Sequence, residues 1–499
     1  MTMEIKLKNI GLIEESEIKL DGLTVITGRN NSGKTTVGKV LFSLIDAVSE
    51  IEKKSQNDIQ DFISDHLEDI SQELNIFRMD SIFPNPNREE RVSLQNRTLS
   101  HFWASTRKNY DEKYIRRLLS AIKKIDVDEY YKKLKQNEPE NNEQKRKVLF
   151  RPAVNKKIIH DQKEAAISAI EDLLEKICSL DLNDYALESI DQTLNKEFSS
   201  QIQPVTRNVK ESEIKLSHED KIYFDLKIQD NKVVKNKSTN SAIFFNAFQN
   251  VYLIDDPFIL DEWTRFSSSY DEILPFRLRY RDENEMIIHA SQANTHRNQL
   301  KQIIFSRKHQ SVFEKTVIDG DIRDIFNKIN EILPGKIGIS ERDDRPSYIT
   351  DTYKIKLFNL AAGTKLFAII KILLEKGKIN KDTLLIFDEP ESHLHPEWQN
   401  AFAEIIVMFI KYLDITVLLT THSSNFMLAI EAFMRKYKIN GKSNFYQTVH
   451  ENNNEMVRYK CVNDNMEYIY IDFVQYLSKM KNLRDSFMDE WYQGWDKNQ

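Results

Sequence analysis

The period of apolar and polar positions changes several times along the chain, and each change predicts a different element. Alternation over 4–8 and 17–20 predicts two strands, and the continuous apolar run over 23–27 predicts a buried strand. The run leads into a helix that we expect to end near residue 48, because apolar residues recur at helical spacing: Val37, Val40, Leu41 and Leu44. The first fifty residues are therefore expected to form strands followed by a helix.

A long, highly charged region with helical patterning follows, from about residue 50 to residue 201. It carries two apolar stripes at helical spacing: Ile115, Leu118, Leu119, Ile122 and Ile125, then Ile167, Ile170, Leu173, Leu174 and Ile177. Segments rich in Pro and Asn interrupt the region at 83–87 and 137–142. Because the stripes are short and broken, we expect packed helices here and not long coiled-coil arms.

Strand patterns return in the second half of the chain. Residues 215–234 alternate, and their predicted apolar face consists of Ile222, Phe224, Leu226 and Ile228. Short apolar runs at 251–254, 384–387 and 416–420 predict strands that are buried on both faces of a parallel sheet. Helical spacing resumes between 294 and 333. Together these patterns predict an α/β protein that has a mixed sheet with flanking helices and a large, mostly helical insertion.

The same changes of pattern divide the chain into six segments. We expect a first part of the sheet domain at 1–50, a helical insertion at 51–204, returning strands at 205–265, a helical segment at 266–334, the second part of the sheet domain at 335–455, and a C-terminal helical tail at 456–499. Aromatic residues repeat along one stripe of the tail, which either packs on the sheet domain or offers a docking surface for a partner.

Composition narrows the class of protein. Of 499 residues, 40% are hydrophobic and 30% are charged, which is typical of a soluble globular protein. The net charge of −6 excludes a general attraction to nucleic acid, so any DNA contact must come from a local patch. Two cysteines, Cys178 and Cys461, exclude a disulfide framework. The N-terminus lacks the apolar core of a signal peptide, so we expect a cytoplasmic protein that is not bound to a membrane.

The stretch Gly28–Thr36 has the order of a phosphate-binding loop. It lies between the predicted strand and helix, and two glycines allow the backbone N–H groups to surround a phosphate: Gly28, Asn30, Asn31, Ser32, Gly33, Lys34, Thr35 and Thr36 make up the expected binding set. Lys34 would contact the β- and γ-phosphates, and the Thr35 hydroxyl would bind Mg²⁺. The chain is therefore expected to bind ATP with Mg²⁺.

Two adjacent acids follow the apolar run at 384–387. Asp388 at the end of this strand is expected to bind Mg²⁺ beside the phosphate loop, and Glu389 is expected to orient and deprotonate the attacking water. The strand at 416–420 is followed by Thr421 and His422, and we expect His422 to contact the γ-phosphate.

The order of these motifs resembles the head of ABC-type ATPases, and it is most similar to the branch that contains the OLD ATPases and the SMC-like repair ATPases. The residues concerned are Gly28–Thr36, Leu360–Lys365, Asp388–Pro396 and Thr420–His422. The resemblance implies that Gly363 and Thr364 belong to a signature loop donated to the nucleotide of another subunit. It also implies that 391–396 forms the loop between opposed sites. ATP would then lie between two heads, so the working unit would be at least a homodimer.

The sequence departs from that family at the signature loop. Ala361 and Ala362 stand where the family usually has a serine hydroxyl. Loss of one charge-assisted hydrogen bond would weaken closure around ATP by about 1.5–3 kcal/mol. We therefore expect slow turnover, with ATP acting mainly as a ligand that sets the state of the protein. The usual Mg²⁺-sensing glutamine cannot be assigned, although Gln249 and the pair Asp255-Asp256 flank a predicted core strand.

The chain lacks the acidic cluster of a nuclease domain. Only 77 residues follow His422, and no paired-carboxylate or HNH-like constellation is visible elsewhere. A head of this size without a nuclease is similar to the PtuA family, the ATPase subunits of Septu-type anti-phage systems. That resemblance implies a homo-oligomer that binds a separately encoded HNH-type nuclease. The ATPase subunit of PARIS-type defence, which acts with a Toprim-like effector, is an alternative.

Two stretches are candidate surfaces for partners. Residues 132–163 contain ten Lys or Arg and four acids, so they could follow DNA phosphates, or they could be an ordinary solvated helix pair. DNA binding by this stretch would favour a further alternative, a RecF-like repair ATPase. The tail stripe could pack on its own domain or anchor a partner: Phe487, Met488, Trp491, Tyr492 and Trp495.

Overall fold

The computed structural model describes most of the chain. The described residues are 3–73, 111–136, 155–219, 221–234, 247–262, 295–305, 320–339, 346–439, 441–450, 456–471 and 478–485. They divide into two compact units, a head formed by 1–49 and 186–499 and a helical unit formed by 50–185. The basic residues 145–147 and the aromatic stripe at 487–495 lie outside the described residues.

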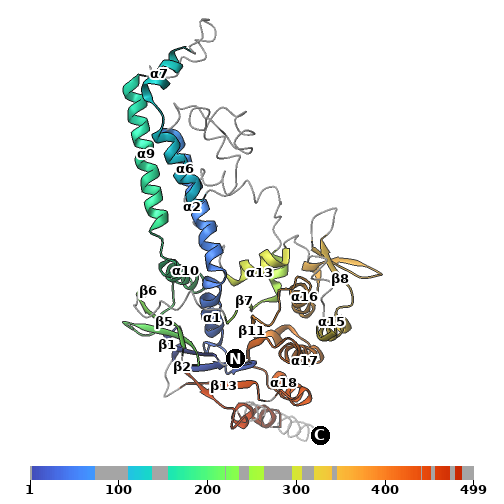
Figure 1. Cartoon of the computed structure of the whole chain (residues 1–499). Coiled ribbons are helices and arrows are strands. Elements are labelled where there is room, and N and C mark those ends of the chain that lie inside the picture. The colour runs from blue at the N-terminus through green and yellow to red at the C-terminus, as the bar shows by residue number, and fades with distance from the viewer. Residues whose placement is uncertain are drawn as a thin grey trace, which may run out of the picture. The chain divides into compact units, whose positions relative to one another are not determined.

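The head is built on an 11-stranded mixed sheet with the order β6-β5-β4-β1-β2-β14-β13-β3-β12-β11-β7 (Figure 1). Its strands are β1 Met3–Ile10, β2 Ile13–Leu20, β3 Leu23–Thr27, β4 Ser212–His218, β5 Lys221–Gln229, β6 Lys232–Val234, β7 Asn250–Ile254, β11 Thr383–Asp388, β12 Thr416–Thr421, β13 Ser443–His450 and β14 Val457–Cys461. The predicted α/β class with a mixed sheet is confirmed.

The strands that carry the predicted motifs lie side by side and run parallel. β3 pairs with β12, β12 with β11, and β11 with β7. The register places Thr421 opposite Thr27 and Asp388 opposite Thr420, so the carboxyl ends of these strands meet at one edge of the sheet. Ligand-binding residues of open parallel sheets lie at this edge, because the loops that follow the strands converge there.

Helices cover both faces of this parallel part, as the continuous apolar runs predicted. On one face α1 Lys34–Val48 packs closely, since a Cβ at Gly38 would lie 2.9 Å from the Ile386 side chain. On the other face one apolar core joins the sheet to α16 Ala362–Glu375, α17 Pro396–Leu413 and α18 Ser424–Tyr437. Leu385 and Phe387 belong to this second core, and so the buried strand β11 contributes to both faces.

Further helices surround the head core. These are α10 Leu182–Glu197, α13 His296–Phe305 and α15 Gly320–Ile332. A separate three-stranded sheet consists of β8 Lys336–Ile339, β9 Pro346–Ile349 and β10 Lys354–Lys356, and short 3₁₀ helices lie at η3 Pro257–Asp261, η4 Leu357–Asn359 and η5 Pro390–His393. None of the helices in the described ranges has the length and apolar character needed to cross a membrane.

Three expectations from the sequence need correction. Ile222 is 38% exposed, whereas Phe224, Leu226 and Ile228 are buried, because an irregularity between Leu216 and Ser217 shifts the register of β4 and β5. Residues 186–204 belong to the head and not to the insertion. The segment expected to begin a helical tail at 456 instead begins with β14, a strand in the middle of the large sheet.

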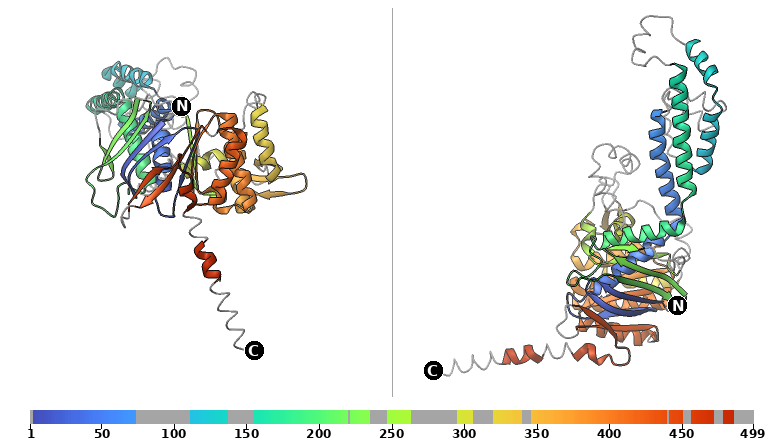
Figure 2. Two further views of the ribbon diagram at one scale, coloured as in Figure 1. Left: turned by 90° about the horizontal axis from the view of Figure 1, so that it is seen from below. Right: turned by 90° about the vertical axis from the view of Figure 1, so that its left-hand side faces the viewer.

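The helical unit contains the long helices α2 Ile51–Glu73 and α9 Lys156–Cys178 and the shorter α6 Glu112–Lys123 and α7 Val127–Gln136. Helices α2, α6 and α9 lie side by side (Figures 1 and 2). The two predicted apolar stripes meet in its core, where the fully buried residues include Ile115, Leu118, Ile122, Ile170 and Leu173. Leu119, Ile167 and Ile177 of the stripes are only partly buried and lie against this core, whose packing stabilises the helices.

Candidate active site

The phosphate loop connects β3 to α1 in a conformation that requires its glycines. Gly28 has φ 156°, and a Cβ there would lie 1.8 Å from the Thr448 hydroxyl of β13. Gly33 has φ 72°, and its carbonyl accepts a hydrogen bond from the Tyr459 hydroxyl of β14 at 2.7 Å. Asn31 also has a positive φ of 61°. Strands β13 and β14 therefore contact the loop and support its conformation. No sequence motif predicted this contribution.

The remaining loop residues take different places. Asn30 is exposed, whereas Ser32 is buried and its hydroxyl donates to the Arg29 carbonyl at 2.7 Å. Thr36 is half-buried, and its backbone N–H donates to the Gly33 carbonyl at 3.1 Å. The loop thus forms a tight turn into the N-terminus of α1, where unpaired N–H groups attract an anion.

Lys34 is the buried cation of the loop, with only 4% of its side chain exposed. Its Nζ donates to the carbonyls of Gly28 and Arg29 at 3.2 and 2.8 Å and lies 3.1 Å from Glu389 Oε1. The ammonium is therefore held by oxygen atoms at the mouth of the loop. A phosphate oxygen could take the place of the carboxylate there.

Thr35 and Asp388 lie in direct contact although 353 positions separate them. The Thr35 hydroxyl donates to Asp388 Oδ2 at 2.6 Å, and the Thr420 hydroxyl donates to Asp388 Oδ1. Burial raises the pKa of Asp388, and the charges of Glu389 and Asp255 raise it further against the opposing effect of the two hydroxyls. Hard oxygen ligands that share excess negative charge fit Mg²⁺, which Thr35 and Asp388 would hold.

Glu389 and His422 face each other across the same edge. Glu389 Oε2 lies 3.2 Å from His422 Nδ1, while its Oε1 is the atom that pairs with Lys34. The Glu389 backbone has φ 48°, an unfavourable value for a side chain of this kind, and its N–H is held by Thr420 at 3.1 Å. Strain of this type occurs where a side chain is aimed at a functional site.

Glu391, the first residue of the expected loop between opposed sites, is buried at the same edge and contacts the strand that leads to His422. It is 2% exposed, and its Oε1 accepts hydrogen bonds from the Thr421 hydroxyl at 2.5 Å and the His422 N–H at 3.1 Å. Burial raises its pKa. Glu391 therefore fixes the backbone that carries His422. The sequence feature that could have indicated this role is a further acid directly after Pro390.

Gly363 and Thr364 lie in the first turn of α16 and not on the phosphate loop. A Cβ at Gly363 would lie 2.9 Å from the Trp398 ring and 3.1 Å from the His393 carbonyl, so this glycine permits close packing of α16 against α17 and η5. The Thr364 hydroxyl donates to the Ala361 carbonyl at 2.6 Å. These two residues thus lie on a different element from the other predicted ligands.

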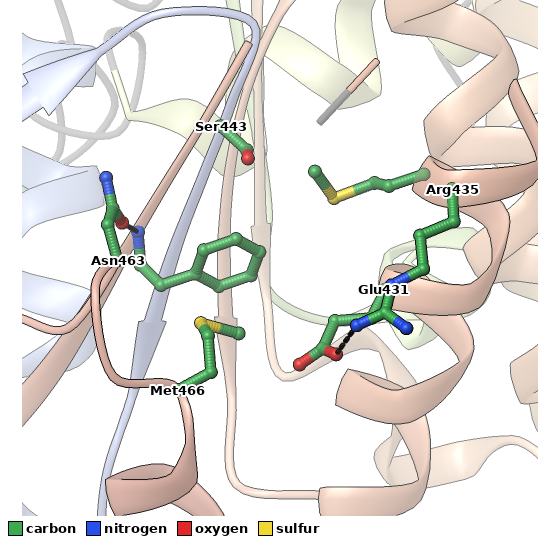
Figure 3. A pocket seen from close by; sticks show the side chains of 7 residues that line it. Glu431, Arg435, Ser443, Asn463 and Met466 are labelled. Carbon is green, nitrogen blue, oxygen red and sulfur yellow. Dashed lines mark hydrogen bonds and ion pairs between the residues drawn. The ribbon is translucent and has the colours of Figure 1, made fainter. Parts of the chain in front are cut away.

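Two of the cavities that the described residues of the head form are relevant here. One of about 240 Å³ borders the catalytic edge, and its lining includes Asp255, Pro257, Leu366, Asp388, Glu389 and His393. The other, of about 230 Å³, lies between α18, β13 and the chain after β14 (Figure 3). Its polar groups already pair with each other, since Arg435 contacts Glu431 at 3.7 Å and Asn463 accepts from the Phe445 N–H at 2.7 Å. The first cavity is therefore the one that belongs to the predicted site.

The described part of the basic stretch 132–163 makes ion pairs within the helical unit. Lys133 pairs with Glu129 and Lys156 with Asp128, both at 2.7 Å. Lys163 donates to the carbonyls of Lys123 and Ile125. These contacts agree with a solvated helix pair and do not by themselves favour a DNA-binding face.

Comparison with known proteins gives one family match. Residues 221–429 match the family model described as "AAA domain, putative AbiEii toxin, Type IV TA system". The matched range contains Gly363, Asp388, Glu389 and His422. It does not contain the phosphate loop Gly28–Thr36, which lies near the N-terminus of the sequence. No curated protein matches the sequence.

Solved structures of SMC heads are similar to the chain at low identity. The Smc head with an extended coiled coil bound to the C-terminal domain of ScpA, from Pyrococcus furiosus, is 10% identical with a TM-score of 0.39, over 95% of this chain and 100% of that one. The SMC head of Thermotoga maritima is 9% identical with a TM-score of 0.32, over 92% and 98%. At these scores the likeness carries no further argument, and the fold class follows from the strand order itself. Residues 221–429 are therefore similar to an AAA-family domain.

Proposed function

We propose that this chain is an ATP-binding, slowly ATP-hydrolysing regulatory subunit of a prokaryotic anti-phage defence complex. One observation supports the ATPase assignment above all others. Lys34 and Thr35 of the phosphate loop contact Glu389 and Asp388 at the same sheet edge, and His422 lies beside them. A cation for phosphates, ligands for Mg²⁺ and a carboxylate base are thereby combined, as phosphoryl transfer to water requires.

Each side chain has a separate role in this proposal. Lys34 leaves Glu389 to bind the β- and γ-phosphates, and this frees the carboxylate to orient and deprotonate water. Thr35 and Asp388 hold Mg²⁺, which neutralises the charge that develops on the phosphates. His422, whose backbone Glu391 fixes, contacts the γ-phosphate.

We propose further that ATP is enclosed between two copies of this chain. The N-terminus of α16 at Gly363 and Thr364 would bind the γ-phosphate of the partner copy through backbone N–H groups. Ala361 and Ala362 offer no hydroxyl to that phosphate, so closure would be weak and turnover slow. The working unit would be a dimer or higher homo-oligomer.

The defence role has a different kind of support. The family matched by residues 221–429 is described as "AAA domain, putative AbiEii toxin, Type IV TA system". The chain has no recognisable nuclease constellation in its sequence, so we assign the cutting of nucleic acid to a separately encoded nuclease of the HNH type. This chain would act as its ATP-dependent regulator.

The ATPase assignment is tested on the purified full chain by nucleotide affinity and phosphate release. Lys34→Ala is expected to weaken ATP binding by about 100-fold or more, because the buried cation of the loop is removed. Lys442→Ala is the matched control, since it removes a lysine of the same domain that is paired with Asp414 at the surface. Equal ATP affinity of Lys34→Ala and the parent would reject the assignment.

The defence assignment is tested by purification from the native operon. We expect a small nuclease to co-purify and its activity to depend on the nucleotide state of this chain. Purification of the chain alone, together with ATP-dependent binding of duplex DNA, would instead favour a RecF-like repair ATPase.

A further inference from the structure

Two buried ionisable side chains, Glu197 and His296, and the half-buried Asp255 connect α10, α13 and the end of β7. The Glu197 side chain is 1% exposed, and its two oxygens accept from the His296 backbone N–H at 2.6 Å and contact His296 Nδ1 at 2.8 Å. His296 Nε2 lies 3.1 Å from Asp255 Oδ2, and the ring of Phe42 on α1 packs edge-on at 5.8 Å. The imidazole is therefore held between two carboxylates.

The charges of this group are fixed by their surroundings. Burial opposes a charge on His296, but hydrogen bonds to Asp255 and Glu197 raise its pKa to about 9. Burial likewise opposes a charge on Asp255, but His296 and Arg297 lower its pKa. At neutral pH an imidazolium thus lies beside an ionised Asp255, and Asp255 can only accept hydrogen bonds.

Asp255 lies at the catalytic edge of the sheet. In the parallel pairing of β7 with β11, Ile254 is opposite Phe387, so Asp255 follows at the level of Asp388. Both carboxylates line the cavity of about 240 Å³ together with Glu389. Gln249 precedes β7 at the opposite end, where its N–H donates to the Asp382 carbonyl, and so it cannot reach this edge.

We propose that Asp255 is a positioning residue for ATP hydrolysis, holding a water molecule in the cavity beside Asp388 and Glu389, and that Glu197 and His296 fix its carboxylate for this task. The inference rests on the proposed ATPase function. One Asp255 oxygen faces His296, and the other lies 3.5 Å from Arg297, which also pairs with Asp256 and Glu262. The carboxylate is held from two sides, and because Asp255 also lines the cavity, a water molecule there can donate to the remaining lone pairs of its oxygens.

The first test uses Asp255→Asn in the full chain. We expect kcat for ATP hydrolysis to fall about 10-fold or more and the Mg²⁺ concentration at half-maximal rate to rise, while ATP affinity changes less than about threefold. Glu404→Gln is the matched control, because Glu404 is a buried, ion-paired carboxylate on α17 outside this site. It should lower thermal stability and leave kcat and the Mg²⁺ dependence unchanged.

The second test separates positioning of Asp255 from a purely structural role of His296. In His296→Gln the amide nitrogen lies near the place of Nε2 and can still donate to Asp255, whereas in His296→Asn it lies near Nδ1 and can donate only to Glu197. We expect His296→Gln to keep most of kcat and His296→Asn to lose about 10-fold. Thermal unfolding of both variants reports the structural effect separately.

The outcomes separate a failure of the Asp255 inference from a failure of the proposed ATPase function. If the parent hydrolyses ATP and Asp255→Asn has the parent kcat and Mg²⁺ dependence, this inference is wrong and the proposed function stands. Equal kcat values of the two His296 variants would also overturn it. If the parent neither binds nor hydrolyses ATP, both the proposed function and this inference are rejected.

Discussion

Two groups of buried carboxylates in the head differ in how their charges are balanced. Glu404 on α17 pairs with Lys436 at 2.6 Å and Lys328 at 3.1 Å and accepts from the Tyr437 hydroxyl, and these partners lower its pKa although burial opposes this. Asp388 instead has only hydroxyl donors and lies near two other acids, so burial and its neighbours raise its pKa.

The difference indicates that the Glu404 group stabilises the fold, whereas the Asp388 group is suited to bind a cation. The Glu404 group is complete, because positive partners already compensate its charge. At the catalytic edge Asp388 accepts hydrogen bonds from two neutral hydroxyls, so a divalent cation would compensate its charge, and perturbed pKa values of this kind gather at functional sites. Substitutions at the catalytic edge should therefore lower kcat, whereas substitutions at the Glu404 group should lower the free energy of unfolding.

The largest effect is expected from Glu389→Gln. Loss of the carboxylate removes the proposed base, so kcat should fall about 100-fold or more while ATP remains bound. The variant should also accumulate as an ATP-bound dimer, visible by light scattering with Mg²⁺ and ATP. Hydrolysis at the parent rate would show that the base is misassigned and would remove the contrast between the two groups.

A smaller effect, on stability, is expected from pH. Folding raises the pKa of His296 from 6.5 to about 9, so proton binding stabilises the head. This contribution is complete below pH 6.5 and is lost as pH rises through about 9. The free energy of unfolding should fall by about 1–3 kcal/mol over that range, and His296→Gln should show a flatter profile. Equal profiles for both proteins would argue against the buried imidazolium.

A smaller effect on kcat than that of Glu389→Gln is expected from Glu391→Gln. The amide still fills the buried position, but it binds the Thr421 hydroxyl and the His422 N–H less strongly than a carboxylate does. We expect kcat to fall about 10-fold and ATP affinity to stay nearly constant. An unchanged kcat would place Glu391 with Glu404, as a residue of structure only.

The smallest effect on chemistry is expected from Glu404→Gln. It should lower the free energy of unfolding by about 1–2 kcal/mol, because two ion pairs are lost, and leave kcat within the error of the assay. Chemical denaturation and phosphate release measured on the same preparation test both statements. A drop in kcat without a drop in stability would contradict the comparison.

Much of the head could be predicted from the sequence because local rules apply there. The glycine spacing of the phosphate loop, the apolar run before Asp388 and Glu389, and the strand before His422 are continuous segments with their own periods. The predicted stripes of the helical unit supply part of its core, to which α2 adds Ile63, Leu67 and Ile70. Residues 145–147 and the aromatic tail stripe remain predictions, since they lie outside the described residues.

Only the tertiary structure decided which distant residues complete the site. Thr448 and Tyr459 support the phosphate loop, Glu391 holds His422, and Glu197 with His296 holds Asp255, although no spacing along the chain relates these residues. The physical reason is that periodicity reports which face of an element is buried but not which strand lies next to it. Strand order and register bring such side chains together, and they result from packing of the whole sheet.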